Sequence, residues 1–167
     1  MRLFIALHFS EEVRHLLIRT IEELKCQSVS GNFTRPENLH LTLAFLGETS
    51  QAEAAKNAID QSVVPAFSMT VGGFGHFGSL YWVGIEPNQQ LNDLAEKLQS
   101  TLCRGGFQIE DRKFKPHITV ARQVRTNSRP RVIVPNVTMP VNRLSLMESE
   151  RIDGKLVYTE LYGKALF

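Results

Sequence analysis

Residues 40–44 read HLTLA and residues 117–121 read HITVA, and the match between these two stretches indicates an internal repeat. Adding 77 to a residue number carries His40 onto His117 and Thr42 onto Thr119. The same shift, without a gap, carries residues 3–6 (LFIA) onto residues 80–83 (LYWV). Further matches are Leu17 with Leu94, Ile21 with Leu98, Cys26 with Cys103 and Arg35 with Arg112. We interpret them as an ancient duplication, with repeats at about residues 3–45 and 80–122 of a single domain spanning 1–167.

Each repeat has the pattern strand, helix, loop, strand. Residues 2–9 and 40–46 are apolar and partly alternating, which predicts strands. Between them, Ser10 is a typical N-cap, followed by two glutamates and an apolar stripe at helical spacing. In the second repeat, Pro87 and Asn88 open a helix that ends at Gly105–Gly106. Residues 117–121 then form the matching strand.

The remaining segments complete the predicted organisation. Residues 50–64 predict a weaker helix closed by Pro65, and residues 67–85 predict a hairpin with a glycine-rich turn region. Residues 141–150 and 156–167 predict two strands around a turn at Asp153–Gly154. The segments 28–38 and 122–140 are polar or broken by proline, so we expect loops there.

Composition places the chain among ordinary globular proteins. Its 167 residues, 43% hydrophobic with a net charge of +2, exclude disorder, collagen-like repeats and small disulfide scaffolds. The early apolar run from Leu3 to Leu7 is shorter than the roughly 7–15 residues of a signal-peptide core or the about 20 of a membrane span. We therefore expect a cytoplasmic protein without a membrane partner. Cys26 and Cys103 fit free, buried thiols in a reducing compartment.

The repeated His-x-Thr pattern carries the candidate chemistry. Because side chains alternate along a strand, His40 and Thr42 share one face, opposite the apolar residues between them. A single His-x-Thr usually marks a half-exposed strand edge. Two copies that meet across a cleft between pseudo-twofold-related lobes would suit acid–base catalysis at a phosphate: one imidazole accepts a proton and the other donates one. The two threonine hydroxyls would bind phosphate oxygens, so that no metal is needed.

The other histidines are weaker candidates. His8 ends the first strand, His15 lies on a helix beside the apolar stripe, and His76 lies in the glycine-rich turn region, so we expect structural or solvated roles for them. A zinc site that combines one of them with His40 and His117 lacks any supporting ligand spacing. We expect neither a metal nor another cofactor.

Basic residues gather around the second His-x-Thr. No acidic residue lies between Arg112 and Met147, whereas eight basic residues do: Arg112, Lys113, Lys115, Arg122, Arg125, Arg129, Arg131 and Arg143. Such a segment is either a solvated loop or a guide for a polyanion. Arg122 follows His117 by five positions, which places it on the opposite face unless the strand twists or bulges; it remains a candidate phosphate ligand. Several aromatic residues could stack on a base, and the sequence does not single one out.

Residues 35–47 (RPENLHLTLAFLG) and 114–122 (FKPHITVAR) resemble the paired motifs of the 2H phosphoesterase superfamily. More narrowly, they resemble RNA 2′,3′-cyclic phosphodiesterases, also called 2′-5′ RNA ligases. Residues 2–7 (RLFIAL), 80–84 (LYWVG) and 144–149 (LSLMES) extend the resemblance over nearly the whole chain.

The resemblance implies a bilobal α+β fold in which two antiparallel sheets line a central cleft, with helices outside. It implies hydrolysis of RNA 2′,3′-cyclic phosphodiester ends to 2′-phosphomonoesters, with reverse 2′-5′ ligation as the minor direction. His40 would be the proton donor, His117 the proton acceptor, and Thr42 and Thr119 the phosphate ligands. The implied partner is an RNA with a 2′,3′-cyclic phosphate end, for which tRNA fragments are one candidate; we expect a monomer.

Two alternatives stay open at this point. Within the enzyme class, the chain could act on small cyclic nucleotides or on 2′-5′ oligonucleotides. Outside it, the chain could be a non-catalytic RNA-binding module that uses the basic segment.

Overall fold

The computed structural model describes residues 1–110 and 113–167, so Arg112 lies outside the described residues. The helices are α1 (Glu11–Cys26), α2 (Ala52–Gln61) and α3 (Gln89–Arg104), with a 3-10 turn η1 (Pro36–Asn38). The predicted caps are confirmed: Ser10 Oγ accepts a hydrogen bond from Val13 N, and Asn88 Oδ1 accepts one from Leu91 N. None of the described helices is long and apolar enough to cross a membrane.

The strands form two antiparallel sheets, which confirms the predicted α+β class. The first sheet has the order β3-β1-β8-β9, with β1 (Arg2–Leu7), β3 (Leu41–Glu48), β8 (Arg143–Ile152) and β9 (Lys155–Ala165). The second has the order β2-β6-β5-β4-β7, with β2 (Ser30–Phe33), β4 (Phe67–Phe77), β5 (Leu80–Ile85), β6 (His117–Arg125) and β7 (Val137–Val141). At the β8–β9 turn, Asp153 and Gly154 both have positive φ, as a tight two-residue hairpin requires.

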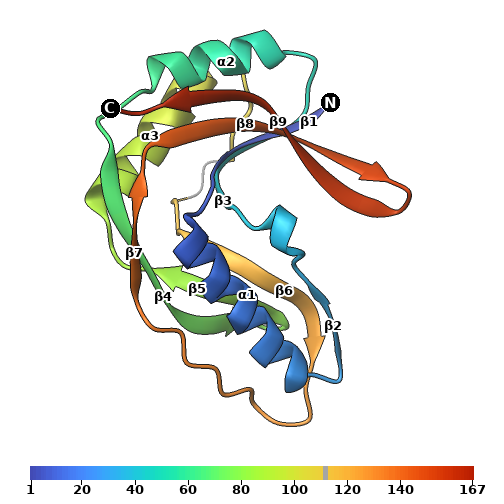
Figure 1. Ribbon diagram of the computed structural model, residues 1–167. Helices are drawn as coiled ribbons and strands as arrows, with labels where there is room; N and C mark the ends of the chain where they lie inside the picture. Colours follow the sequence, from blue (N-terminus) through green and yellow to red (C-terminus); the bar gives the residue numbers. More distant parts are fainter. Residues whose placement is uncertain (111–112) are drawn as a thin grey trace.

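The helices cover the outer faces of the sheets in a crossed arrangement (Figure 1). Helix α1 follows β1 of the first sheet, but it packs against β2, β6 and β7 of the second. Helix α3 follows β5 of the second sheet, but it packs against β3 of the first and against α2. Each repeat therefore supplies the helix that buries the other repeat's sheet, and a single hydrophobic core joins the two lobes.

Two segments predicted as loops contain regular structure. Residues 28–38 include β2 and η1, and residues 122–140 include the end of β6 and the start of β7. The edge strand β2 reads SGNF, which has no alternating apolar pattern of its own, and it exists because its backbone pairs with β6. Tertiary pairing thus overrides a weak local signal.

The predicted burial of the two cysteines is wrong. Cys26 and Cys103 are both free and exposed. They lie in the last turns of α1 and α3, where the buried positions are held by leucine and threonine instead.

In the structure, the first strands of the two repeats correspond with an offset that differs by one residue from the offset of 77 in the sequence match. Ala6 pairs with Thr42, and Trp82 pairs with Thr119, so the strand that begins each repeat aligns with a shift of 76 rather than 77. Packing explains the difference, because Ile5 and Tyr81 are buried in the main core whereas Phe4 packs on the other side of its sheet. The duplication itself stays a prediction.

Candidate active site

The two His-x-Thr pairs meet in one cleft between the sheets. His40 and Thr42 line it from the first sheet, and His117 and Thr119 line it from the second. The cleft has a volume of about 1150 Å³ and also includes Arg122. The structure thus brings together in one cleft all five residues that the sequence nominated.

A bulge follows each threonine and orients the residues beyond it. In the first sheet, Thr42 pairs with Ala6 and Ala44 pairs with Ile5, so Leu43 is the extra residue. In the second, Thr119 pairs with Trp82 and Ala121 pairs with Tyr81, which leaves one extra residue at position 120. A bulge places two successive side chains on the same side of the sheet and so reverses the alternation.

This reversal settles the orientation of Arg122. Val120 and Ala121 are both buried, and the next side chain, Arg122, points to the cleft side with His117. The corresponding residue in the first lobe is Phe45, which is also exposed and also lines the cleft. The possibility that Arg122 faces away from the site is therefore excluded, and the bulge is the reason.

Each imidazole makes an equivalent hydrogen bond to the backbone carbonyl two residues before it. His40 Nδ1 lies 2.7 Å from Asn38 O, and His117 Nδ1 lies 2.8 Å from Lys115 O. A carbonyl oxygen only accepts, so each ring must carry a proton on Nδ1. In the neutral ring, Nε2 is then the nitrogen with the lone pair. His40 Nε2 lies 2.9 Å from Thr42 Oγ1, whose hydroxyl donates to it when the imidazole is neutral.

His40 is packed among aromatic side chains. Its ring centroid lies 4.9 Å from that of Phe4 and 5.1 Å from that of Tyr158, which meets it edge-on. Burial lowers the pKa of His40, the hydrogen bond to Asn38 opposes this change, and the charge of His8 adds to it. In the other lobe, His117 meets Phe77 edge-on at 5.7 Å.

The last strand anchors the loop that carries His40. Asn38 is buried, and its Nδ2 donates to Leu156 O at 3.0 Å. Arg35 donates to the same carbonyl oxygen. Sequence reasoning missed Asn38 and Tyr158, because the first contributes a backbone carbonyl to His40 and the second lies far away in the chain. The one sequence signal for Asn38 is its position two residues before His40, because Lys115 holds the same position before His117.

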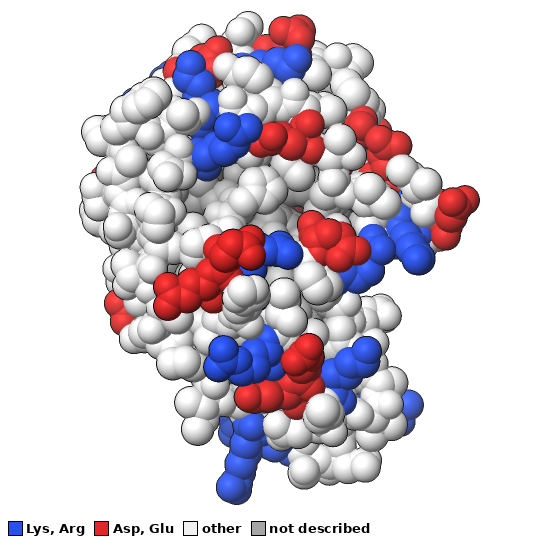
Figure 2. All heavy atoms as spheres, viewed as in Figure 1, with Lys and Arg blue, Asp and Glu red and all other residues white. Residues whose placement is uncertain are grey.

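The predicted basic segment separates in space. Lys113, Lys115 and Arg122 line the cleft. Arg129 and Arg131 instead line a separate hollow beside Gln27, and Arg143 pairs with Glu160. On the face shown in Figure 2, basic and acidic side chains lie side by side rather than in one continuous basic surface.

The remaining histidines have local partners. His15 lies 3.9 Å from Glu11 on the exposed side of α1, and His76 is hydrogen-bonded to Gly78 O and stacks on Tyr81. His8 directly follows β1 and lies within the electrostatic influence of Glu160. Within residues 1–110 and 113–167, no group of three or more His, Cys, Asp or Glu side chains is placed to hold a metal ion.

Comparisons with known proteins agree with this architecture. The 2'-5' RNA ligase superfamily matches residues 13–153. A Thermotoga maritima protein named RNA 2',3'-cyclic phosphodiesterase is 32% identical to this chain, over 97% of this chain and 94% of the relative. An Escherichia coli protein of the same name is also 32% identical, over 99% of this chain and 96% of the relative. The structure of E. coli LigT complexed with 3'-AMP has a TM-score of 0.85 at 31% identity, covering 99% of this chain and 97% of that one.

The backbone hydrogen bonds predict the tautomers of both cleft histidines. In their neutral form, the imidazoles of His40 and His117 should carry the ring proton on Nδ1, because the carbonyl oxygens of Asn38 and Lys115 accept a hydrogen bond from it. Long-range ¹H–¹⁵N correlation spectra of the imidazoles measure this directly. The exposed His15 is the control, for which we expect a tautomer mixture. A proton on Nε2 of neutral His40 would contradict the proposed geometry.

Proposed function

The chain belongs to the 2'-5' RNA ligase superfamily, and we propose that it hydrolyses RNA 2′,3′-cyclic phosphodiester ends to 2′-phosphomonoesters. The observation that carries the proposal is the pair of imidazoles in one cleft, each with Nδ1 tied to a backbone carbonyl. Relatives that match nearly the full length of the chain are named RNA 2',3'-cyclic phosphodiesterase, which supports the same substrate class.

In this proposal the two histidines move one proton each. His117 accepts a proton from water as the water oxygen attacks phosphorus, and the bond between phosphorus and the 3′-oxygen breaks. His40 donates its Nε2 proton to the departing 3′-oxygen. The phosphate stays on the 2′-oxygen, and the next cycle begins when each histidine has returned to its starting protonation state.

Thr42, Thr119 and Arg122 would hold the phosphate between the histidines. Their hydroxyl and guanidinium groups are fixed donors, which stabilise charge on the phosphoryl oxygens as the water attacks. Substrate binding would also favour the protonated form of His40 that the mechanism needs. Burial lowers the pKa of His40 in the free protein, whereas an anionic phosphate beside the ring favours the imidazolium. The substrate thus helps to create the acid that its own cleavage needs.

The same groups would allow the reverse reaction. If an RNA 5′-hydroxyl replaces water as the nucleophile, the products are joined through a 2′-5′ bond. Hydrolysis is favoured in water, so we propose ligation as the minor direction. Fragments of tRNA are candidate substrates for a monomeric, cytoplasmic enzyme of this kind.

A second candidate substrate class has a specific observation behind it. E. coli LigT, the structural relative, has been crystallised with 3'-AMP, with ATP and with NADP+. Small nucleotides therefore bind to a related protein, and a phosphodiesterase acting on small cyclic nucleotides is the runner-up. A non-catalytic RNA-binding module is less favoured, because the basic segment on which it depends is divided between the cleft and other surfaces.

Removal of either imidazole tests the proposed roles. His40→Ala and His117→Ala should each lower kcat by about 10²–10⁴-fold, because each removes one proton-transfer group. The measurement is release of 2′-phosphomonoester ends from an RNA with a 2′,3′-cyclic phosphate, and His15→Ala is the control. Near-normal turnover in either cleft variant would refute the two-histidine mechanism. Salt-sensitive RNA binding without turnover by the wild type would favour the binding module.

Arg122 and Arg129 form a matched pair for testing the phosphate site. Both are arginines of the same basic segment, but only Arg122 lines the cleft. Arg122→Ala should lower kcat/KM by about 10²-fold, because a donor to the phosphoryl oxygens is lost. Arg129→Ala removes the same charge and should leave kcat/KM within about twofold at physiological salt. Equal losses would show that only overall charge matters.

A further inference from the structure

The two halves of the cleft share the same backbone framework but differ next to their histidines. Each half supplies a backbone carbonyl, an imidazole, a threonine and a bulge in the same order. In the first sheet, the β1–β3 ladder ends with Leu7 opposite Leu41, so His8 is the next residue in the register, near His40. In the second sheet, the residue that pairs with His117 is Gly84. One cleft histidine therefore has an ionisable neighbour and the other has none at that position.

Packing enforces the difference. A Cβ atom on Gly84 would lie only 2.9 Å from the carbonyl oxygen of Gly72 on the neighbouring strand. The second lobe thus has no room for a side chain where the first lobe has His8. The exposed His8 side chain meets no such restriction at the end of β1.

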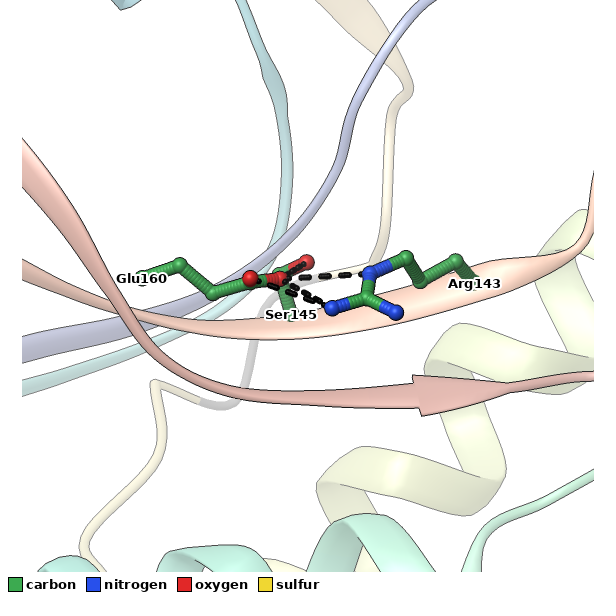
Figure 3. Close-up of polar contacts among 3 residues, drawn as sticks. All are labelled: Arg143, Ser145 and Glu160. Atoms are coloured by element: carbon green, nitrogen blue, oxygen red, sulfur yellow. Dashed lines mark hydrogen bonds and ion pairs between the residues drawn. The ribbon is translucent and has the colours of Figure 1, made fainter.

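A fixed anion faces His8 from the last strand. The carboxylate of Glu160 on β9 accepts hydrogen bonds from Arg143 at 3.1 Å and from Ser145 Oγ at 2.6 Å, as Figure 3 shows. These bonds hold the pKa of Glu160 below its usual range, so the carboxylate remains ionised. Ser145 is fully buried, and Arg143 lies two residues before it on β8, so both donors to Glu160 belong to the same strand.

Four ionisable side chains act on His8 or are acted on by it. They are Glu160 on β9, Arg143 on β8, Arg14 on α1 and His40, which directly precedes β3. Burial lowers the pKa of His8, Glu160 raises it, and the two arginines lower it further. The charge of His8 in turn lowers the pKa of His40. A positive charge on His8 therefore disfavours the imidazolium form of His40.

We propose that His8 is a positioning residue that makes His40 and His117 inequivalent, because an imidazole lies next to His40 where the second lobe has only Gly84 opposite His117. Its catalytic meaning rests on the proposed function. The additional imidazole on one side of the cleft lowers the pKa of His40 through its charge. Glu160, fixed by Arg143 and Ser145, sets how readily His8 itself becomes charged.

The proposal is tested by titrating the imidazoles individually. NMR titrations of His40 and His117 are recorded in the wild type, His8→Gln and His8→Lys, with His15→Gln as control. His8→Gln removes the neighbouring charge and should raise the pKa of His40. His8→Lys makes the charge permanent and should lower it. His117 should stay unchanged in both variants, and His15→Gln should move neither cleft histidine.

Opposite shifts in the two variants would support the electrostatic role, because a purely structural defect would not reverse sign. Unchanged titration of His40, shifts in one direction only, or equal shifts at His117 would overturn the proposal. The pH profile of kcat/KM on RNA with a 2′,3′-cyclic phosphate then separates the proposal from the proposed function. A shifted titration with a matching shift in the basic limb supports both. If the NMR titration of His40 shifts but the pH profile of kcat/KM does not, the effect of His8 on His40 is supported. The proposed role of His40 as proton donor is then contradicted.

Discussion

Each cleft histidine donates its Nδ1 proton to the backbone carbonyl two residues before it, and the chemistry of the site depends on this hydrogen bond. Because a carbonyl cannot donate, the bond fixes both the ring orientation and the tautomer. It leaves Nε2 as the nitrogen available for proton exchange. For His40 the carbonyl belongs to Asn38, which is held by Leu156 of the last strand. The C-terminal hairpin is therefore part of the support for a histidine more than a hundred residues earlier in the chain.

The crossed helices explain how two separate motifs remain in register. Helix α1 covers the sheet that carries His117, and α3 covers the sheet next to His40. Neither repeat can bury its own sheet without the helix of the other, so the lobes share one core and their relative orientation is fixed by packing. Both His-x-Thr pairs line the cleft between the lobes. The helices pack on the outer faces of the sheets (Figure 1). A site with fixed donors on both sides of a phosphate needs this rigidity.

Much of the site could be predicted from sequence, because it depends on residues that repeat at a constant spacing. His40, Thr42, His117 and Thr119 were placed correctly in one cleft, and the caps Ser10 and Asn88 marked their helices. The orientation of Arg122 could not be derived, since Val120 fits simple alternation and conceals the bulge. Strand β2 and the partners of His40 arise from contacts between distant segments. Cys26 and Cys103 show the limit of composition: hydrophobic residue type predicted burial, whereas helix geometry exposed them.

The most direct test of the account is to incubate the protein, in the presence of EDTA, with an RNA that ends in a 2′,3′-cyclic phosphate. Fixed side-chain donors and two imidazoles suffice in the proposed mechanism, so turnover should persist in the chelator. The product should carry its phosphate on the 2′-oxygen, because His40 protonates the departing 3′-oxygen. Loss of activity in EDTA, or a product with the phosphate on the 3′-oxygen, would contradict the account.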